Sequence, residues 1–245
     1  MPPFLVPSFC IAALMLILLL ALKTTFKSIL PRHGNILLAV GALLVECTCL
    51  AAGVILDRHD GNPATPWIGK VLALVGLGLF IRAALKSFSL ADIGLCAPRP
   101  NSHWPTLLVL VALLAMNLAT AHFIPIHREL TLASMLFMAL VSGLDEEIVF
   151  RGLMPSLLRT HDKPQGKGRA ANAILVFSIP TIAFALMHAW RFQSGHFVFA
   201  WGTFAYIAIG ACGLMYVRLR SGSLLNSVVL HNLTNVATAI ALSMK

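Results

Sequence analysis

The chain has 245 residues, of which 58% are hydrophobic and only 11% are charged. A soluble domain normally has an apolar share of less than half, so this composition excludes a soluble globular protein and predicts an integral membrane protein. The formal net charge is +9, but the basic residues lie in short loops between apolar runs. This scatter argues against a nucleic-acid-binding surface, which would need a concentrated basic patch.

Long apolar runs divide the chain into candidate membrane spans. A run of about 20 apolar residues can cross a hydrocarbon core of about 30 Å as a helix. Helices are expected because a spanning segment must satisfy its own backbone hydrogen bonds. The sequence therefore predicts an all-α polytopic membrane protein with about eight transmembrane helices. Their approximate ranges are 4–22, 36–56, 68–85, 106–124, 130–150, 171–190, 196–217 and 223–243.

The distribution of lysine and arginine predicts the orientation of these helices. Thirteen of the 18 basic residues follow the first, third, fifth or seventh apolar run. Cytoplasmic loops carry an excess of such residues, so these loops are expected in the cytoplasm and both termini outside it. The absence of eukaryotic targeting signals and of long loops favours a bacterial inner membrane. The five basic residues assigned to the non-cytoplasmic side are Arg58, Lys70, Arg128, Arg191 and Lys245.

Polar chemistry is distributed unevenly between two predicted parts of the chain. Residues 1–125 contain the first four helices and few candidate catalytic residues, and Glu46 in the second helix is the exception. We interpret Glu46 either as a proton or substrate contact or as a hydrogen-bonded structural carboxylate. Residues 126–245 contain the last four helices and most of the candidate functional residues.

The segment 144–153, LDEEIVFRGL, places three carboxylates and an arginine in an apolar helical run. An ionisable group at membrane depth is by default a functional-site hypothesis, because it is costly unless paired or hydrated. Glu147 and Arg151 are four residues apart with the acid first, which is the favourable order for a helical ion pair. Glu146 projects roughly 100° away from Glu147, so a second carboxylate is left free.

Two later apolar runs add histidines and a carboxamide. His188 ends the sequence F-A-L-M-H in the sixth run, and His231 and Asn235 are four residues apart in the eighth. Residues four apart lie on the same face of a helix. Polar groups on three segments near the end of the chain indicate one shared cavity.

Convergence in one cavity requires an adjustment of the helix boundaries. At about 1.5 Å per residue, the ranges above place His188 deeper in the membrane than Glu146. We therefore expect the fifth helix to continue through Leu158 and the sixth to enter the membrane near Val176.

These residue types suit peptide-bond hydrolysis without a covalent nucleophile. A glutamate can take a proton from water and deliver it to a leaving amine. The histidines would position the water, and Asn235 could stabilise an oxyanion. The alternative is a zinc ion bound by Glu146, His188 and His231, although the H-E-x-x-H motif of zinc proteases is absent.

Two other intramembrane protease classes fit less well. A G-x-S-G serine-protease motif would need glycine in place of Leu140, and the sequence around Asp145 does not form the G-x-G-D of aspartyl proteases. A non-catalytic protein, either a bacteriocin immunity scaffold or a transporter, is also compatible with the same polar cluster.

Three motifs together resemble the CPBP family, the CAAX-protease and bacteriocin-processing intramembrane peptidases related to type II CAAX prenyl endopeptidases. The family patterns E-E-x-x-x-R, F-x-x-x-H and H-x-x-x-N or D occur in this order. The matching segments are EEIVFRG at 146–152, FALMH at 184–188 and GSLLNSVVLHNLTN at 222–235. The resemblance covers roughly residues 130–240.

The resemblance implies a glutamate-dependent endopeptidase. It leaves metal dependence open, and we expect the metal-free glutamic type, with no cofactor. Glu146 would activate the attacking water, and Glu147 with Arg151 would form the second acid and its ion pair. His188 matches the second motif, and His231 and Asn235 would contact water and stabilise the oxyanion. The implied partners are the lipid bilayer and a protein or peptide substrate at the membrane. Eukaryotic relatives trim prenylated CAAX tails, whereas bacterial members are linked to bacteriocin maturation or immunity, or to cutting C-terminal sorting tails.

Overall fold

A computed structural model describes residues 5–25, 31–57, 67–84, 89–123, 129–160 and 167–244. The described residues are helical except for loops and one β-hairpin. The long helices are α1 (Leu5–Thr25), α2 (His33–Asp57), α3 (Trp67–Ala84), α4 (His103–Phe123), α8 (Lys167–Ala189), α9 (Trp201–Ser221) and α10 (Leu224–Ser243). Short elements are η1 (Pro100–Ser102), α5 (Leu132–Leu140), α6 (Leu144–Glu147), η2 (Ile148–Leu153) and α7 (Met154–Leu158).

Six of the described helical segments are long and apolar enough to cross a membrane, namely α1, α2, η1 with α4, α8, α9 and α10. The helix α3 has 18 residues and corresponds to the predicted run 68–85. The predicted class, an all-α polytopic membrane protein, is confirmed, and the number of eight spans stays a prediction.

The predicted run 130–150 is not one continuous helix. The helix α5 ends at Leu140, and the chain turns before α6 begins at Leu144. The Gly143 amide donates a hydrogen bond to Asn232 Oδ1 at 2.9 Å, so a contact with α10 satisfies the backbone at the break. From Leu144 the chain is helical through α6, η2 and α7 to Leu158, which confirms the predicted extension.

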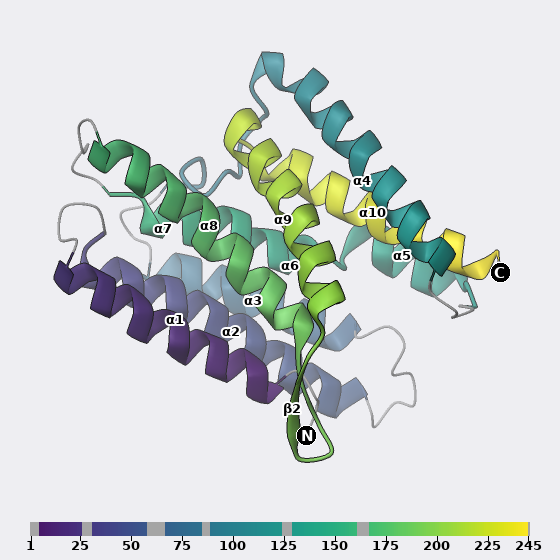
Figure 1. Cartoon of the computed structure of the whole chain (residues 1–245), viewed down its shortest axis with the longest axis horizontal. Helices are drawn as coiled ribbons and strands as arrows, with labels where there is room; N and C mark the ends of the chain where they lie inside the picture. Colours follow the sequence, from purple (N-terminus) through teal and green to yellow (C-terminus); the bar gives the residue numbers. More distant parts are fainter. Residues whose placement is uncertain are drawn as a thin grey trace.

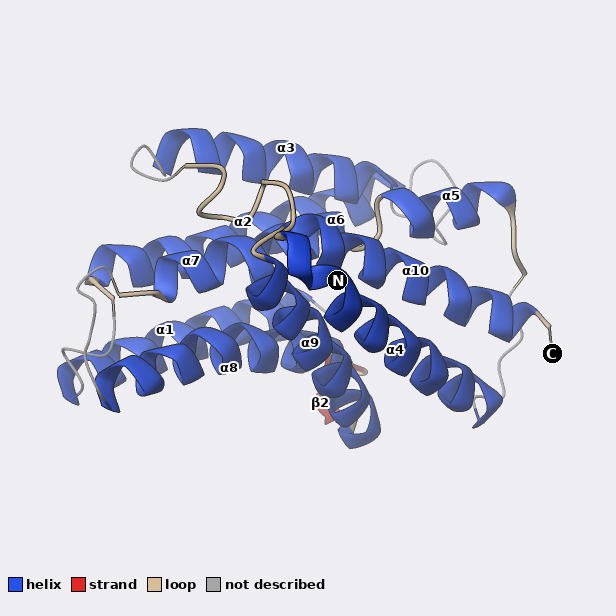
Figure 2. Ribbon diagram, turned by 90° about the horizontal axis from the view of Figure 1, so that it is seen from above, coloured by secondary structure: helices blue, strands red, loops and turns tan. Residues whose placement is uncertain are grey.

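The helices form two groups with α9 and α6 between them (Figures 1 and 2). One group contains α1, α2, α3, α7 and α8, and the other contains α4, α5 and α10. The helix α9 packs against α8 on one side and against α4 and α10 on the other. The catalytic candidates in α6, α8 and α10 are therefore brought to the middle of the molecule.

The largest hydrophobic core joins both halves of the chain. Leu19, Leu43 and Leu77 come from α1, α2 and α3, and Phe150 and Leu157 come from η2 and α7. All five side chains are almost fully buried. The segment that continues the acidic cluster is thus packed directly against the N-terminal helices.

A hairpin that the sequence pattern did not predict connects α8 to α9. Its strands are β1 (Trp190–Gln193) and β2 (His196–Phe199), which pair antiparallel with Gln193 opposite His196. Ser194 and Gly195 form the two-residue turn with positive φ angles of 49° and 81°. Two-residue hairpin turns with positive φ match the twist of the strands.

One predicted loop residue belongs to a helix instead. Arg218 was assigned to a cytoplasmic loop, but α9 continues to Ser221 and buries this side chain. Its Nε donates to the Arg151 carbonyl oxygen at 3.0 Å. A hydrogen bond to the η2 backbone explains why a charged residue is tolerated there.

Candidate active site

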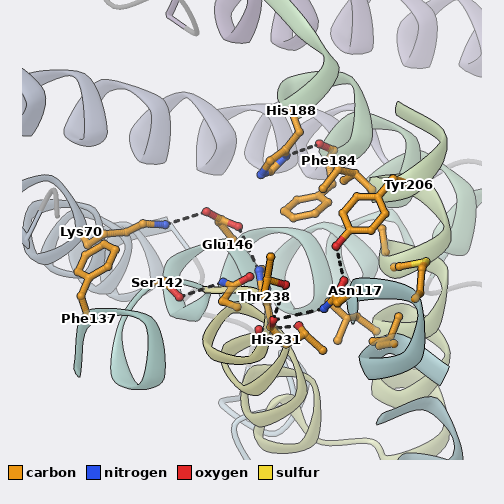
Figure 3. Close-up of a pocket in the computed structure, with 18 residues that line it drawn as sticks. Lys70, Asn117, Phe137, Ser142, Glu146, Phe184, His188, Tyr206, His231 and Thr238 are labelled. Atoms are coloured by element: carbon orange, nitrogen blue, oxygen red, sulfur yellow. Dashed lines mark hydrogen bonds and ion pairs between the residues drawn. The ribbon is translucent and has the colours of Figure 1, made fainter. Parts of the chain in front are cut away.

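A cavity of about 320 Å³ lies among α3, α4, α6, α8, α9 and α10 (Figure 3). The structure brings four of the six predicted site residues to its wall, namely Glu146, His188, His231 and Asn235. The remaining two, Glu147 and Arg151, are buried and do not line it. The predicted convergence of three separate apolar segments on one cavity is thereby confirmed.

Glu146 is the partly exposed carboxylate of the acidic cluster. Its side chain is 19% exposed, whereas those of Asp145 and Glu147 are fully buried. One oxygen, Oε1, accepts a hydrogen bond from Lys70 Nζ at 2.8 Å. The other, Oε2, lies 3.8 Å from His231 Nε2. Only Glu146 in this cluster combines a charged partner with access to the cavity.

His231 lies between the two adjacent glutamates. Its Nδ1 is 2.8 Å from Glu147 Oε1, a distance at which the Nδ1 proton is donated to the carboxylate. In the neutral ring Nε2 then has the free lone pair, and this nitrogen faces Glu146. A histidine oriented in this way by a buried carboxylate can accept or donate a proton on the cavity side.

Glu147 and Arg151 form the predicted ion pair, with Arg151 Nη1 at 3.0 Å from Glu147 Oε1. Both side chains are at most 1% exposed, so the pair is fully removed from solvent. The guanidinium also lies over the Phe184 ring, 4.3 Å from its centroid. In the described part of the chain none of the guanidinium nitrogens has an aligned hydrogen bond. The pairing is therefore ionic and cation–π in character.

His188 is oriented by its own helix. Its Nδ1 lies 2.9 Å from the Phe184 carbonyl oxygen and donates to it, which leaves Nε2 with the free lone pair. The Phe184 ring packs against His188 at 4.4 Å and against His231 at 6.0 Å between centroids. One phenylalanine thus contacts both histidines and Arg151.

Asn235 and its neighbour Asn232 contact the break between α5 and α6. Asn235 Nδ2 donates to Ser142 Oγ at 3.0 Å. Asn232 accepts from the Gly143 amide and donates to the Ala139 carbonyl at 3.1 Å. A Cβ on Gly143 would lie 2.7 Å from the His231 ring, so only glycine allows this close approach. The sequence analysis did not include Asn232 among the site residues, although an asparagine next to the motif histidine in an apolar helix indicates a polar contact.

Lys70 is the principal site residue that the sequence analysis missed. It was counted only among the basic residues of the non-cytoplasmic side, at the start of the predicted run 68–85, but it is buried in α3 and lines the cavity. Its Nζ donates to Asp145 Oδ1 and to Glu146 Oε1, each at 2.8 Å. The sequence did contain evidence for this role, because a lysine in an apolar helix indicates a functional site as much as a glutamate does.

A second polar group lies in the same cavity beyond Phe184 (Figure 3). The Tyr206 hydroxyl donates to Asn117 Oδ1, and Asn117 Nδ2 donates to the Thr234 carbonyl at 3.3 Å. Leucine, methionine and isoleucine side chains line the wall as well, contributed by Leu113, Met116, Ile207 and Leu214. The cavity therefore combines two polar regions with apolar surface, as binding sites for organic ligands do.

Glu46 does not belong to this cavity. Its side chain is 1% exposed and does not line the cavity wall. Neither carboxylate oxygen has a hydrogen-bond partner among the described residues. The described residues therefore support neither a hydrogen-bonded structural role for Glu46 nor a direct substrate contact.

The zinc alternative fits these side chains poorly. Among the described residues no three His, Cys, Asp or Glu side chains are close enough together to hold one metal ion. The Lys70 ammonium also lies 2.8 Å from Glu146 Oε1 and would repel a cation there. As arranged here, Glu146, His188 and His231 do not form a zinc ligand set.

Comparison with known families gives a match to the second half of the chain. Residues 128–237 match the family described as type II CAAX prenyl endopeptidase Rce1-like. The matched segment contains all six predicted site residues and extends from the residues before α5 into α10. Among curated proteins and solved structures no match was found. The chain is a polytopic membrane protein, and its residues 128–237, called the Rce1-like domain below, are similar to type II CAAX prenyl endopeptidases, which supports the predicted assignment to the CPBP family of CAAX-type intramembrane proteases.

Proposed function

We propose that this protein hydrolyses a peptide bond with water activated by Glu146, without a metal ion. The observation that supports this proposal is the asymmetric environment of the Glu146 carboxylate. Oε1 is held by Lys70 at 2.8 Å, whereas Oε2 faces the cavity 3.8 Å from His231 Nε2. A general base needs one oxygen free for the water proton and a fixed orientation toward it.

The reaction follows from this arrangement. Glu146 Oε2 takes a proton from water, and the water oxygen attacks the carbonyl carbon of the scissile peptide bond. The carbonyl oxygen becomes an oxyanion, for which the Asn235 carboxamide is a suitable hydrogen-bond donor. The proton on Glu146 then passes to the leaving nitrogen, the carbon–nitrogen bond breaks, and a carboxylic acid and an amine leave.

The charges around Glu146 support proton transfer at this position. The three carboxylates of Asp145, Glu146 and Glu147 face two permanent cations, Lys70 and Arg151. A proton on His231 would bring the net charge of this cluster to zero, and a proton on Glu146 would do the same. Because burial of net charge is costly, a cluster that is neutral with one mobile proton suits general acid–base catalysis.

The substrate belongs to this proposal as well. A catalytic group on membrane helices reaches polypeptides that are in or at the bilayer, so we propose a membrane-associated or exported protein substrate. We also propose a bacterial inner membrane, with both termini outside the cytoplasm. The membrane location rests on the apolar helices, and the orientation rests on the distribution of basic residues between their loops. The bacterial assignment rests on the lack of eukaryotic targeting signals and of long loops in the sequence.

The test is the cleavage of candidate exported proteins that are co-expressed with the protease. New protein termini are identified by mass spectrometry for the wild type, Glu146→Gln and Glu129→Gln. Glu129 is exposed and lies outside the cavity, so its variant controls for the chemical change. The proposal expects cleavage in the wild type and in Glu129→Gln, and none in Glu146→Gln.

Two results would contradict the proposal. Cleavage by folded Glu146→Gln at the wild-type rate would exclude Glu146 as the base. Identical termini with and without the wild-type protease, over a broad candidate set, would favour the non-catalytic immunity scaffold or transporter. Folding of each variant is checked by its elution as a single species from gel filtration in detergent.

A further inference from the structure

The position of Lys70 is unfavourable for a lysine on three counts. It is buried, it lies in the first turn of α3, and it is surrounded by apolar helices. A buried ammonium is costly unless paired, and a cation at a helix N-terminus opposes the helix dipole. Helix stability therefore does not explain Lys70, and its two carboxylate partners must offset the cost.

The two partners of Lys70 differ in what they can reach. Asp145 is fully buried and does not line the cavity, so it cannot contact a substrate. Glu146 is partly exposed and lines the cavity. The ammonium thus links a buried anchor to the proposed base, with Nζ–O distances of 2.8 Å on both sides.

This link fixes the free oxygen of Glu146. A glutamate side chain has three rotatable bonds, and without a partner its carboxylate would sample several orientations. The hydrogen bond from Lys70 occupies Oε1 and leaves Oε2 on the side of His231. A base held in one orientation reacts faster, because a displacement of about 1 Å can cost about 100-fold in rate.

We infer that Lys70 is the positioning residue of the catalytic glutamate, and that the N-terminal half of the chain thereby completes the active site. The inference rests on the proposed function of Glu146. It goes beyond the Rce1-like domain, because α3 lies outside the matched residues 128–237. The matched segment alone then contains the base but not the group that orients it.

The packing of α3 supports the inference independently. At Gly53 and Gly69 the helices α2 and α3 approach so closely that a Cβ on Gly53 would lie 1.9 Å from the Gly69 Cα. Gly69 directly precedes Lys70 in the chain. The first turn of α3 is thus fixed against α2 immediately beside the lysine, which limits the freedom of its backbone.

The test compares four variants of the full-length protein in a peptide-cleavage assay with a substrate identified by co-expression. Lys70→Met removes the ammonium, Lys70→Arg keeps a cation, and Arg82→Met removes an exposed cation from the same helix. The fourth, Lys70→Met with Asp145→Asn, removes the buried pair together. This double variant addresses folding, because breaking a buried ion pair destabilises far more than removing both partners.

The inference expects Lys70→Met to lower kcat by about 100-fold with little change in KM. Lys70→Arg should recover part of this loss, and Arg82→Met should leave kcat unchanged. The double variant should fold like the wild type, as shown by gel filtration and thermal unfolding, and should still have the low kcat.

Wild-type kcat in the double variant would overturn the inference, because Lys70 would then serve only to neutralise Asp145. Wild-type kcat in folded Lys70→Met would overturn it as well. The proposed function is tested separately by Glu146→Gln in the same assay. An inactive Glu146→Gln with a fully active Lys70→Met contradicts the role of Lys70 alone, whereas an active Glu146→Gln contradicts the role of Glu146.

Discussion

Replacement of Arg151 by methionine should destabilise the folded protein more than almost any other single change near the site. Arg151 and Glu147 are at most 1% exposed, and their closest atoms are 3.0 Å apart. Methionine has a similar length and no charge, so it would fill most of the space but leave the Glu147 carboxylate without its cation. His231 would be the one remaining polar neighbour that the described structure gives to Glu147.

The magnitude follows from the burial of the pair. Removal of one partner of a buried ion pair costs about 3–5 kcal/mol, because the other charge stays buried without compensation. The cation–π contact with Phe184 at 4.3 Å would be lost as well, at a cost of about 1–2 kcal/mol where the cation is desolvated. The whole free energy of unfolding is typically about 5–15 kcal/mol, so the variant should be close to unfolding.

The assay is equilibrium unfolding in mixed micelles, followed by tryptophan fluorescence. The matched control is Arg151→Met combined with Glu147→Gln, which removes both charges and keeps an acceptor for His231. Paired replacement of a buried ion pair is often close to neutral, so the double variant should regain most of the lost free energy. A single variant within about 1 kcal/mol of the wild type would refute the account, since exposed pairs contribute that little.

Three further predictions concern the cavity and the topology. Gly143→Ala should lower kcat by about 100-fold, because its Cβ would lie 2.7 Å from the His231 ring. The control Gly34→Ala, whose Cβ would have no atom within 4 Å, should leave cleavage unchanged. Equal cleavage rates for the two variants would show that the backbone at Gly143 can shift to accommodate the Cβ. A metal chelator should not lower the cleavage rate, and restoration of lost activity by added zinc would contradict the metal-free mechanism. Reporter fusions should place both termini outside the cytoplasm, and a cytoplasmic signal from either terminus would reverse the predicted orientation.

Hydropathy predicted the helices well because burial in lipid is a property of whole segments. The helices α2, α4 and α10 lie close to the predicted runs 36–56, 106–124 and 223–243. The break within 130–150 was not predictable in this way. Ser142 and Gly143 do not end an apolar run, and the backbone there is satisfied by Asn232, which lies about 90 residues further along the chain.

The site was predictable where its spacing is local. Glu147 and Arg151 form the pair that their i, i+4 spacing indicated. The role of Lys70 was missed because this residue was considered only in the count of basic residues on each side of the membrane. The rule that marked Glu146 as functional, an ionisable residue in an apolar helix, applies equally to Lys70. The sequence therefore contained both halves of this ion pair but not the tertiary packing that joins them.

The dependence of the site on the N-terminal helices has a physical cause. Three adjacent carboxylates at positions 145–147 cannot all be buried as anions unless cations lie beside them. Arg151 is on the same helical segment and pairs with Glu147, but the permanent cation that the described structure gives to Asp145 and Glu146 comes from α3. A helix outside the Rce1-like domain must therefore supply the missing charge. The first half of the chain is for this reason part of the electrostatics of the active site, and not only a scaffold that places it in the membrane.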